Sequence, residues 1–325
     1  MAVEAPPRRR TLWRRFRRAT RGPRNAALAW LLYWVARAVG ALPVPVALAL
    51  GRALGSAAYV VLGRPRRFAL AHVALAFPDL DDVARHELVR NTFRHAGQSY
   101  AELGVYRTLA RDPDYVRIEG DALDVALARG GGAIAITGHV GNWELLAATM
   151  ARRGLALTVV ARKVNDPRFD ALITRFRGGA GMTVLLRDDP KFLSLVRDAL
   201  GRNHIVALLI DQDSRGGGVF VPFFGRPAHT PPGAAILALR TKAPVVSVFI
   251  HRRPEGGHTI VFDAMPIESG GAGRVTALTA QFTAAIEAAI RRSPAEWVWW
   301  HERWRRQPEA SSTDAVRDAP EMQRG

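Results

Sequence analysis

Short apolar runs rich in β-branched residues alternate with helical patterns through the second half of the chain, and this alternation restricts the possible folds. The runs lie at 133–137, 157–161, 183–186, 205–210, 245–250 and 259–263, and the helical patterns at about 143–153, 167–178, 190–200, 231–241 and 274–291. Consecutive parallel strands need a crossover, which is usually a helix. The sequence therefore predicts an α/β fold with a mostly parallel central sheet flanked by helices. A polar segment at 251–258 reads as a hairpin link, so the last strand is expected to run antiparallel.

The N-terminal region combines a basic segment with an apolar one. Residues 1–25 carry nine arginines and one acid, which is +8 of the net charge of +17. Between residues 26 and 63 the only charged residues are Arg37 and Arg52, and two apolar helices are expected at about 26–41 and 44–62. They could lie in a membrane surface with the basic segment on anionic lipids, provide a single span, or form a soluble helix pair. A further helical region, 79–111, follows, with a start signal at Asp79–Asp82.

The carboxyl ends of the predicted strands carry the candidate catalytic residues, because chemistry in such sheets collects there. His139 and Glu144 follow the run 133–137 in the segment TGHVGNWE, and Asp211 and Asp213 follow the run 205–210. Either aspartate could orient an imidazole that acts as a base. The alternatives are a histidine that caps the next helix and aspartates that cap a loop. No metal site is predicted, since the chain has no cysteine and the spacing is not that of a helical zinc motif.

Other side chains in this region are candidates for binding a lipid substrate. Arg162, Arg175 and Arg177 follow the run 157–161, and guanidinium groups bind phosphate. The apolar segment 219–225, expected to be a loop, could line a site for an acyl chain or belong to the core. Together with a histidine base, these features indicate transfer of an acyl group to a hydroxyl at a membrane.

Two further features have structural interpretations. Thr230, before two prolines, is expected to cap the next helix. The Trp-rich segment 297–304 is expected either to lie at a membrane interface or to pack against the sheet, with no catalytic role.

Four segments resemble the late lipid A biosynthesis acyltransferases and the related phosphatidylinositol mannoside acyltransferases. GHVGNWELLA resembles their HX4[D/E] block, and the resemblance, from about residue 26 to 306, extends to LAHVALAFPDL, to the long segment that begins DQDSRGGGVFVPFFG, and to SPAEWVWWHERW. It implies that His139 is the general base, that Glu144 is the motif acid, and that Asp211 or Asp213 orients the base. It also places Arg162, Arg175 and Arg177 where the family binds a phosphate-bearing substrate. The phenylalanines implied to border the acyl groove are Phe220, Phe223 and Phe224.

The function implied is O-acyl transfer from an acyl thioester to a hydroxyl of a glycolipid, a lipid A precursor, without a resident cofactor or metal. Acyl carrier protein is the expected donor and a CoA thioester the alternative. Residues 1–25 are expected to be a basic arm, 26–64 membrane-associating helices, 65–306 the acyltransferase domain and 307–325 a disordered tail. The enzyme is expected at the cytoplasmic face of the bacterial inner membrane, on anionic lipids, either peripheral or with a single span.

Three alternative functions follow from the same residues. One is a CoA-dependent acyltransferase for phosphatidylinositol mannoside or another lysophospholipid or glycolipid. A nucleic-acid-binding protein would explain the net charge, but the basic segment leads into apolar sequence, so no nucleic-acid partner is expected. A serine hydrolase would need a G-x-S-x-G turn, which the sequence lacks.

Overall fold

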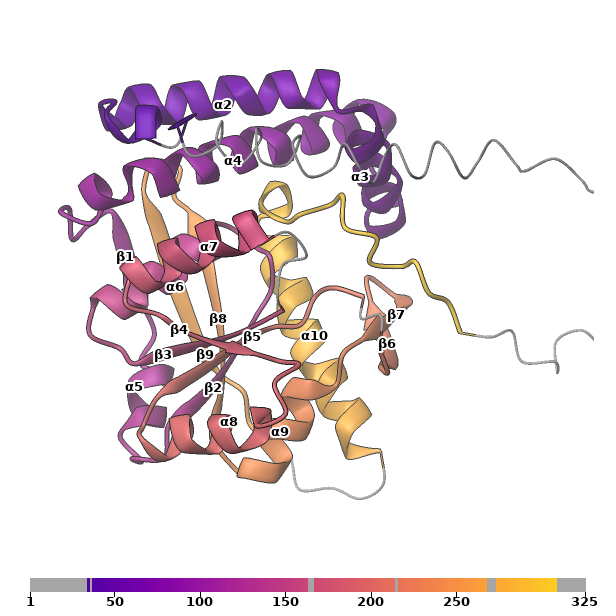
Figure 1. The fold of residues 1–325 in the computed structure, drawn as a ribbon. Helices are drawn as coiled ribbons and strands as arrows, with labels where there is room; N and C mark the ends of the chain where they lie inside the picture. Colours follow the sequence, from indigo (N-terminus) through magenta and orange to yellow (C-terminus); the bar gives the residue numbers. More distant parts are fainter. Residues whose placement is uncertain (1–33, 36, 163–166, 214–215, 268–272, 309–325) are drawn as a thin grey trace, which may run out of the picture.

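The central sheet of the computed structural model has seven strands, and five of them run in one direction (Figure 1). The structure describes residues 34–35, 37–162, 167–213, 216–267 and 273–308. The strands are β1 (Val116–Glu119), β2 (Ala133–Thr137), β3 (Leu157–Ala161), β4 (Thr183–Leu186), β5 (Ile205–Leu209), β8 (Val245–Arg252) and β9 (His258–Ala264), in the order β1-β9-β8-β2-β5-β3-β4. The predicted fold class is confirmed. β9 runs antiparallel to β8, as the hairpin link predicted, and the unpredicted β1 pairs parallel with β9.

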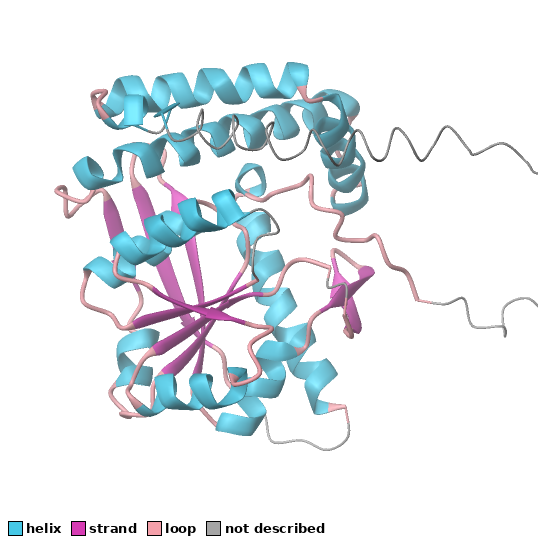
Figure 2. Ribbon diagram, in the orientation of Figure 1, coloured by secondary structure: helices cyan, strands magenta, loops and turns pink. Residues whose placement is uncertain are grey.

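Each face of the sheet is covered by helices, because alternate side chains of a strand point to opposite faces. In β2, Ala133 and Ala135 belong to one buried core and Ile134 and Ile136 to the other. The first core includes side chains of α5 (Ala122–Leu127), α6 (Trp143–Arg152) and α7 (Pro167–Gly179), and the second those of α8 (Phe192–Gly201), α9 (Gly233–Thr241) and α10 (Arg274–Arg292). Figure 2 shows these helices around the strands. Continuous apolar strands such as β2 are thus buried on both sides.

Three further helices form a layer across one end of the sheet (Figure 1). They are α2 (Val44–Val61), α3 (Gly63–Ala76) and α4 (Asp82–Leu109). α4 begins where the sequence predicted, because the Asp81 carboxylate accepts a hydrogen bond from the Ala84 N–H. α2 corresponds to the helix expected at 44–62, whereas most of the helix expected at 26–41 lies outside the described residues. The Trp-rich end packs under this layer, with Trp297 and Trp299 fully buried, so the packing alternative is the correct one.

α2 and α4 pack closely through small residues. A Cβ atom on Gly97 of α4 would overlap the backbone carbonyl of Gly51 on α2, and one on Gly55 would overlap the carbonyl of Phe93. The opposite side of α2 is apolar and exposed, through Val46, Leu50, Leu54, Val60 and Val61. Among the described residues, α2 is the one helix long and apolar enough to cross a membrane, judged by length and composition alone. One side of α2 therefore packs on α4, and the side chains on its other side are exposed among the described residues.

A hairpin replaces the loop that was expected at 219–225, so that prediction is wrong. β6 (Val219–Phe223) pairs antiparallel with β7 (Arg226–Thr230) through a two-residue turn. Both turn residues, Phe224 and Gly225, have positive φ, as the tight hairpin turn requires. A phenylalanine rarely adopts this conformation, which is why no hairpin turn was predicted at Phe224. Thr230 is consequently a strand residue and not the cap of α9, which Pro232 precedes directly.

The close packing of α2 on α4 leads to a prediction about Gly97→Ala. Alanine favours helices over glycine by about 1 kcal/mol, but at position 97 its Cβ would push α2 away, which costs about 1–3 kcal/mol. We expect a lower Tm in detergent for Gly97→Ala. The matched control is Gly63→Ala at the start of α3, where a Cβ has open space. A Tm for Gly97→Ala at or above that of the control would contradict the packing described.

Candidate active site

Strand register brings His139 and Asp211 together. β2 and β5 are adjacent and parallel, with Thr137 opposite Leu209, so the residues two positions further along each strand emerge side by side. His139 Nδ1 lies 2.7 Å from Asp211 Oδ1, and the His139 backbone N–H donates to Asp211 Oδ2 at 2.8 Å. Asp211 therefore holds both the ring and the backbone of this histidine.

Asp211 is a buried carboxylate with three donors. The third is the indole N–H of Trp297, 2.8 Å from Oδ2, and the Asp211 side chain has no exposed surface. Burial alone would raise the pKa of Asp211, but the charge of His139 and the hydrogen bonds from His139 and Trp297 outweigh it and hold this pKa well below its usual range. Asp211 is thus ionised near neutral pH. In the tautomer where Nδ1 donates to it, His139 Nε2 is left as an acceptor.

Two glycines shape the loop that carries His139. A Cβ on Gly138 would press on the Asp211 carboxyl group, so a side chain there would interfere with the backbone hydrogen bond. Gly141 has a φ of +64° and lies against the Ile250 carbonyl, which leaves no room for a Cβ. The loop ends at Asn142, whose side-chain oxygen accepts from the Leu145 N–H and caps α6. The predicted location of His139, between a strand and a helix, is confirmed.

Glu144 faces an arginine and not the histidine. Its carboxylate pairs with Arg177 of α7 through two hydrogen bonds, with Nη2 to Oε1 at 2.5 Å and Nε to Oε2 at 3.1 Å. Within the described part of the chain, no hydrogen bond or ion pair joins Glu144 to His139. The motif acid and the arginine thus form a forked pair at the first turn of α6.

Two residues beside His139 were not among the predicted site residues. Gln212 Nε2 lies 3.1 Å from His139 Nε2 and 3.1 Å from His301 Nδ1, so its amide can donate to both rings. The rings of His139 and His301 are edge to face, with centroids 5.2 Å apart. Burial and the charge of His139 lower the pKa of His301 to about 4, so this second ring is neutral near pH 7. His301 lies in the Trp-rich segment 297–304, for which the sequence predicted no catalytic role.

Two cavities meet at His139, Trp143 and Gln212, which line both of them. The larger, the arginine cavity, has a volume of about 1070 Å³, and its cationic lining is Arg162, Arg177, Arg187 and Arg305. The smaller, the α4 cavity, has a volume of about 260 Å³ between α4 and the segment 296–301, and its lining includes Ala96, Tyr100, Leu103, Val298 and Trp300. One imidazole therefore faces a cationic cavity on one side and a mixed, partly apolar cavity on the other.

Several predicted site residues lie elsewhere. Asp213 contacts His229 and Arg305 and not His139, so Asp211 is the aspartate of the imidazole pair. Arg175 is exposed and does not line the arginine cavity. Phe223 and Phe224 are buried against Trp297, Trp299 and other aromatic rings, and neither lines a cavity at His139. Phe220 lies in β6 with its ring against His229.

Comparison with known proteins identifies the family to which the chain belongs. The sequence pattern of the family described as bacterial lipid A biosynthesis acyltransferase matches residues 14–306. The chain therefore belongs to this family, and the resemblance noted from its motifs is confirmed.

Curated relatives carry two kinds of name. The chain is 31% identical to a phosphatidylinositol mannoside acyltransferase of Mycobacterium tuberculosis over 203 residues, which are 61% of this chain and 63% of that protein. It is 28% identical to the lipid A biosynthesis lauroyltransferase of Escherichia coli over 291 residues, 87% of this chain and 92% of the relative. A lipid A biosynthesis palmitoleoyltransferase of the same organism is 26% identical over 279 residues, 84% of this chain and 89% of the relative. The match thus spans less than two thirds of the mycobacterial protein and most of the two others.

The buried histidines predict how stability depends on pH. The pKa of His95 is lowered by burial to about 4, like that of His301, so between about pH 6.5 and 4 the unfolded chain takes up protons that the folded chain does not. Stability is therefore complete above pH 6.5 and falls on acidification, which Tm measurements in detergent from pH 8 to 4 would detect. In the double variant His95→Asn, His301→Asn, Tm should decrease less on acidification than in the wild type. Replacing the exposed His86 by asparagine should leave the decrease unchanged. Equal slopes in all three proteins would show that the buried rings are not held neutral.

Proposed function

We propose that this protein is a membrane-associated O-acyltransferase that moves a fatty acyl chain from a thioester donor to a hydroxyl of a glycolipid. The observation that carries the proposal is the His139–Asp211 pair at the junction of two cavities, in a chain of this family. A reaction between two large substrates needs an access route for each, and both routes must end at the base.

His139 acts as the general base and Asp211 as its orienting partner. Nδ1 donates to Asp211, and Nε2 takes the proton of the acceptor hydroxyl while the hydroxyl oxygen attacks the thioester carbonyl carbon. The C–S bond then breaks, and the leaving thiolate receives the proton back from Nε2. The ionised Asp211 stabilises the imidazolium between these steps and leaves the ring in the same tautomer at the end.

Gln212 occupies the position that the acceptor hydroxyl must take. Its amide donates to Nε2 of His139 in the structure, so an incoming hydroxyl replaces this hydrogen bond with its own. The displaced amide stays beside His139 and can donate to the oxyanion that forms on the thioester carbonyl. The neutral ring of His301 restricts the amide to this side of the base without adding a competing positive charge.

Substrate binding divides between the cavities. The arginine cavity suits a phosphate-bearing substrate, because Arg162, Arg177 and Arg187 line it and guanidinium groups bind phosphate. The α4 cavity takes the acyl end of the other substrate along its apolar and aromatic residues. Acyl carrier protein is the proposed donor, since an acidic carrier suits a chain of net charge +17, and a CoA thioester is the alternative.

The acceptor is proposed to be a lipid A precursor. The alignment with the lauroyltransferase covers 87% of the chain, while the mannoside acyltransferase is more similar over a shorter stretch. Phosphatidylinositol mannoside is therefore the second candidate. Purified enzyme supplied with each acceptor, and with acyl carrier protein or CoA thioesters, distinguishes these by mass spectrometry of the acylated product.

Of the membrane arrangements considered, α2 lying in the membrane surface at the cytoplasmic face is the one proposed here. One side of α2 packs along α4, which carries exposed Arg90 and other charged residues, so a spanning α2 would bring these charges into hydrocarbon. In the surface orientation the exposed apolar side chains of α2, among them Val46, Leu50 and Leu54, enter the bilayer, and the basic segment 1–25 binds anionic headgroups.

The catalytic proposal predicts a steep loss of activity for two variants. His139→Ala should lower kcat by at least about 10³-fold, because the base is removed, and Asp211→Asn by a similar factor, because the orienting carboxylate is lost. Asp213→Asn should cost about tenfold or less, since Asp213 does not contact the imidazole. Steady-state acyl transfer with radiolabelled donor measures all three, with the exposed His86→Ala as control. A tenfold loss or less for His139→Ala would exclude the proposed role.

The orientation of α2 can be measured with single cysteines, because the chain has none of its own. Spin labels on Val46→Cys, Leu54→Cys and Val61→Cys should report one shallow depth in vesicles of anionic lipid. A spanning helix of 18 residues is about 27 Å long and would place its two ends at opposite interfaces. Depths that pass through the bilayer centre at Leu54 and return to the surface at both ends would refute the in-plane orientation.

A further inference from the structure

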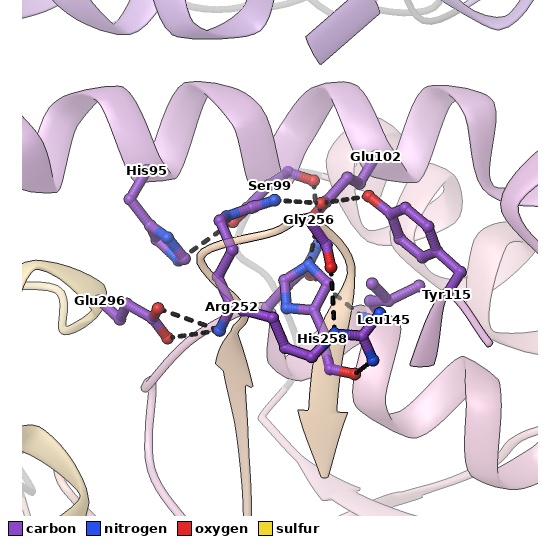
Figure 3. Close-up of polar contacts among 11 residues, drawn as sticks. His95, Ser99, Glu102, Tyr115, Leu145, Arg252, Gly256, His258 and Glu296 are labelled. Carbon is purple, nitrogen blue, oxygen red and sulfur yellow. Dashed lines mark hydrogen bonds and ion pairs between the residues drawn. The ribbon is translucent and has the colours of Figure 1, made fainter. Parts of the chain in front are cut away.

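Glu102 is a fully buried carboxylate in the C-terminal third of α4, outside every motif that defined the candidate site. Its Oε1 accepts from the Tyr115 hydroxyl at 2.8 Å, from Arg252 Nη1 at 2.6 Å and from His258 Nε2 at 2.9 Å (Figure 3). Its Oε2 accepts from Asn142 Nδ2 at 2.8 Å. Burial alone would raise the pKa of Glu102, but the hydrogen bonds and charges of His258 and Arg252 hold it well below its usual range. α4 thus contributes one ionised group to the region under it.

Asn142 connects this carboxylate to the loop of the base. It stands three residues after His139 and two before Glu144, and both the oxygen and the nitrogen of its side-chain amide form hydrogen bonds. Oδ1 caps α6, while Nδ2 donates to Glu102 and to the Ser99 carbonyl, also on α4. The start of α6 is thereby tied to α4 at a position between the two residues of the proposed motif.

The opposite side of the same loop is tied to the C-terminal segment. The Gly141 N–H donates to the Glu296 carbonyl, and Val140 bridges to Trp297, whose indole holds Asp211. Arg252 joins the two sides, since its guanidinium contacts Glu102 and its backbone N–H donates to the Glu296 carboxylate. Figure 3 shows Arg252 between these two acids.

A buried ionic cluster contributes little net free energy of folding, because its charges must be removed from water. An apolar cluster of similar volume is often as stable or more stable, so a buried ion pair is better explained by the orientation that it imposes. Here the cluster orients the residues between His139 and Glu144. These residues must hold the imidazole against Asp211 and the Glu144 carboxylate against Arg177 at the same time.

We infer that Glu102 is a positioning residue for the acyl transfer proposed above, fixing through Asn142 the loop that sets His139 against Asp211. The inference rests on the proposed function for its kinetic consequences. Its structural content, that loss of the Glu102–Asn142 hydrogen bond moves the His139 ring relative to Asp211, does not require activity.

The test compares buried variants that differ in their contact with Asn142. Glu102→Gln and Asn142→Asp both disturb the hydrogen bond between the two residues, and Asn142→Asp keeps a cap for α6. Tyr115→Phe removes a different hydrogen bond from the same carboxylate and leaves Asn142 in place. Glu87→Gln, exposed on the same helix, is the surface control.

We expect kcat to fall about 10- to 100-fold in Glu102→Gln and in Asn142→Asp, because a small misplacement of a base costs this much, with little change in KM. Tyr115→Phe should lower Tm but keep kcat within about threefold. In the background of Asp211→Asn, where the imidazole is no longer held by a carboxylate, Glu102→Gln should lower kcat much less than it does in the wild type. If Tyr115→Phe reduces kcat as much as Asn142→Asp, or if the kinetic effects are additive, Glu102 has only a structural role.

A second readout separates this inference from the proposed function. In protein labelled with 15N-histidine, the Nδ1–H proton of His139 resonates at low field through its hydrogen bond to Asp211. Its assignment is made with His139→Ala. The resonance should shift in Glu102→Gln and Asn142→Asp and stay in place in Tyr115→Phe. A resonance that does not shift in Glu102→Gln and Asn142→Asp overturns the inference. Full activity in His139→Ala overturns the proposed function, and the spectra then still decide whether Glu102 positions the His139 ring.

Discussion

The hydrogen-bonded pair of His139 and Asp211 connects the carboxyl ends of two strands with the Trp-rich segment. A buried carboxylate is costly unless donors surround it. The donors of Asp211 come from the loop after β2 and from Trp297 near the C-terminal end of the described chain. Satisfying one charge therefore fixes the carboxyl ends of β2 and β5 and the packing of the Trp-rich segment together. The interaction that would prepare the base for chemistry is also one that the folded state needs.

The helical layer extends this coupling toward the proposed membrane surface. α2 is bound to α4 by close backbone contacts at Gly51 and Gly97, and α4 contacts the loop of the base through Glu102. α4 also lines one of the cavities that reach His139. On the proposed membrane orientation, the same helix would separate lipid from the sheet, line the route of one substrate and hold the loop of the base. An acceptor with its tails in a bilayer could reach the site at the edge of this layer.

The positions of the strands along the chain could be predicted from the sequence, but the order of the strands in the sheet could not. The bounds of β2, β3 and β4 match the predicted runs, because parallel strands joined by crossover helices are short and apolar. Sheet order is not encoded in such runs, and β3 and β4 lie between β2 and β5 in the chain although β2 and β5 are adjacent in space. The choice between Asp211 and Asp213 depends on that adjacency and on the register of Thr137 with Leu209. Periodicity alone therefore left both aspartates open.

The composition also could not show which arginines stabilise the fold and which line a cavity. Arg303 is fully buried, donates to the carbonyl of His229 and to the Thr230 hydroxyl, and serves the fold, as Arg252 does in the Glu102 cluster. Arg162 and Arg187 line the arginine cavity, but nothing in their local sequence distinguishes them from Arg175, which does not. A count of positive charges indicates the kind of partner, and the positions of the guanidinium groups decide which of them can bind it.

Arg177 explains why an acid should stand five residues after the histidine without touching it. The two hydrogen bonds that Arg177 donates to the Glu144 carboxylate fix the plane of the guanidinium where it lines the arginine cavity. Glu144 belongs to the first turn of α6, so its place is set by the cap at Asn142, as that of His139 is set by Asp211. On the proposed mechanism, one short loop thus places the base directly and the phosphate-binding arginine through its acid. The loop would then set the separation between His139 and Arg177, and with it the distance between the hydroxyl and the phosphate of an acceptor that fits the site.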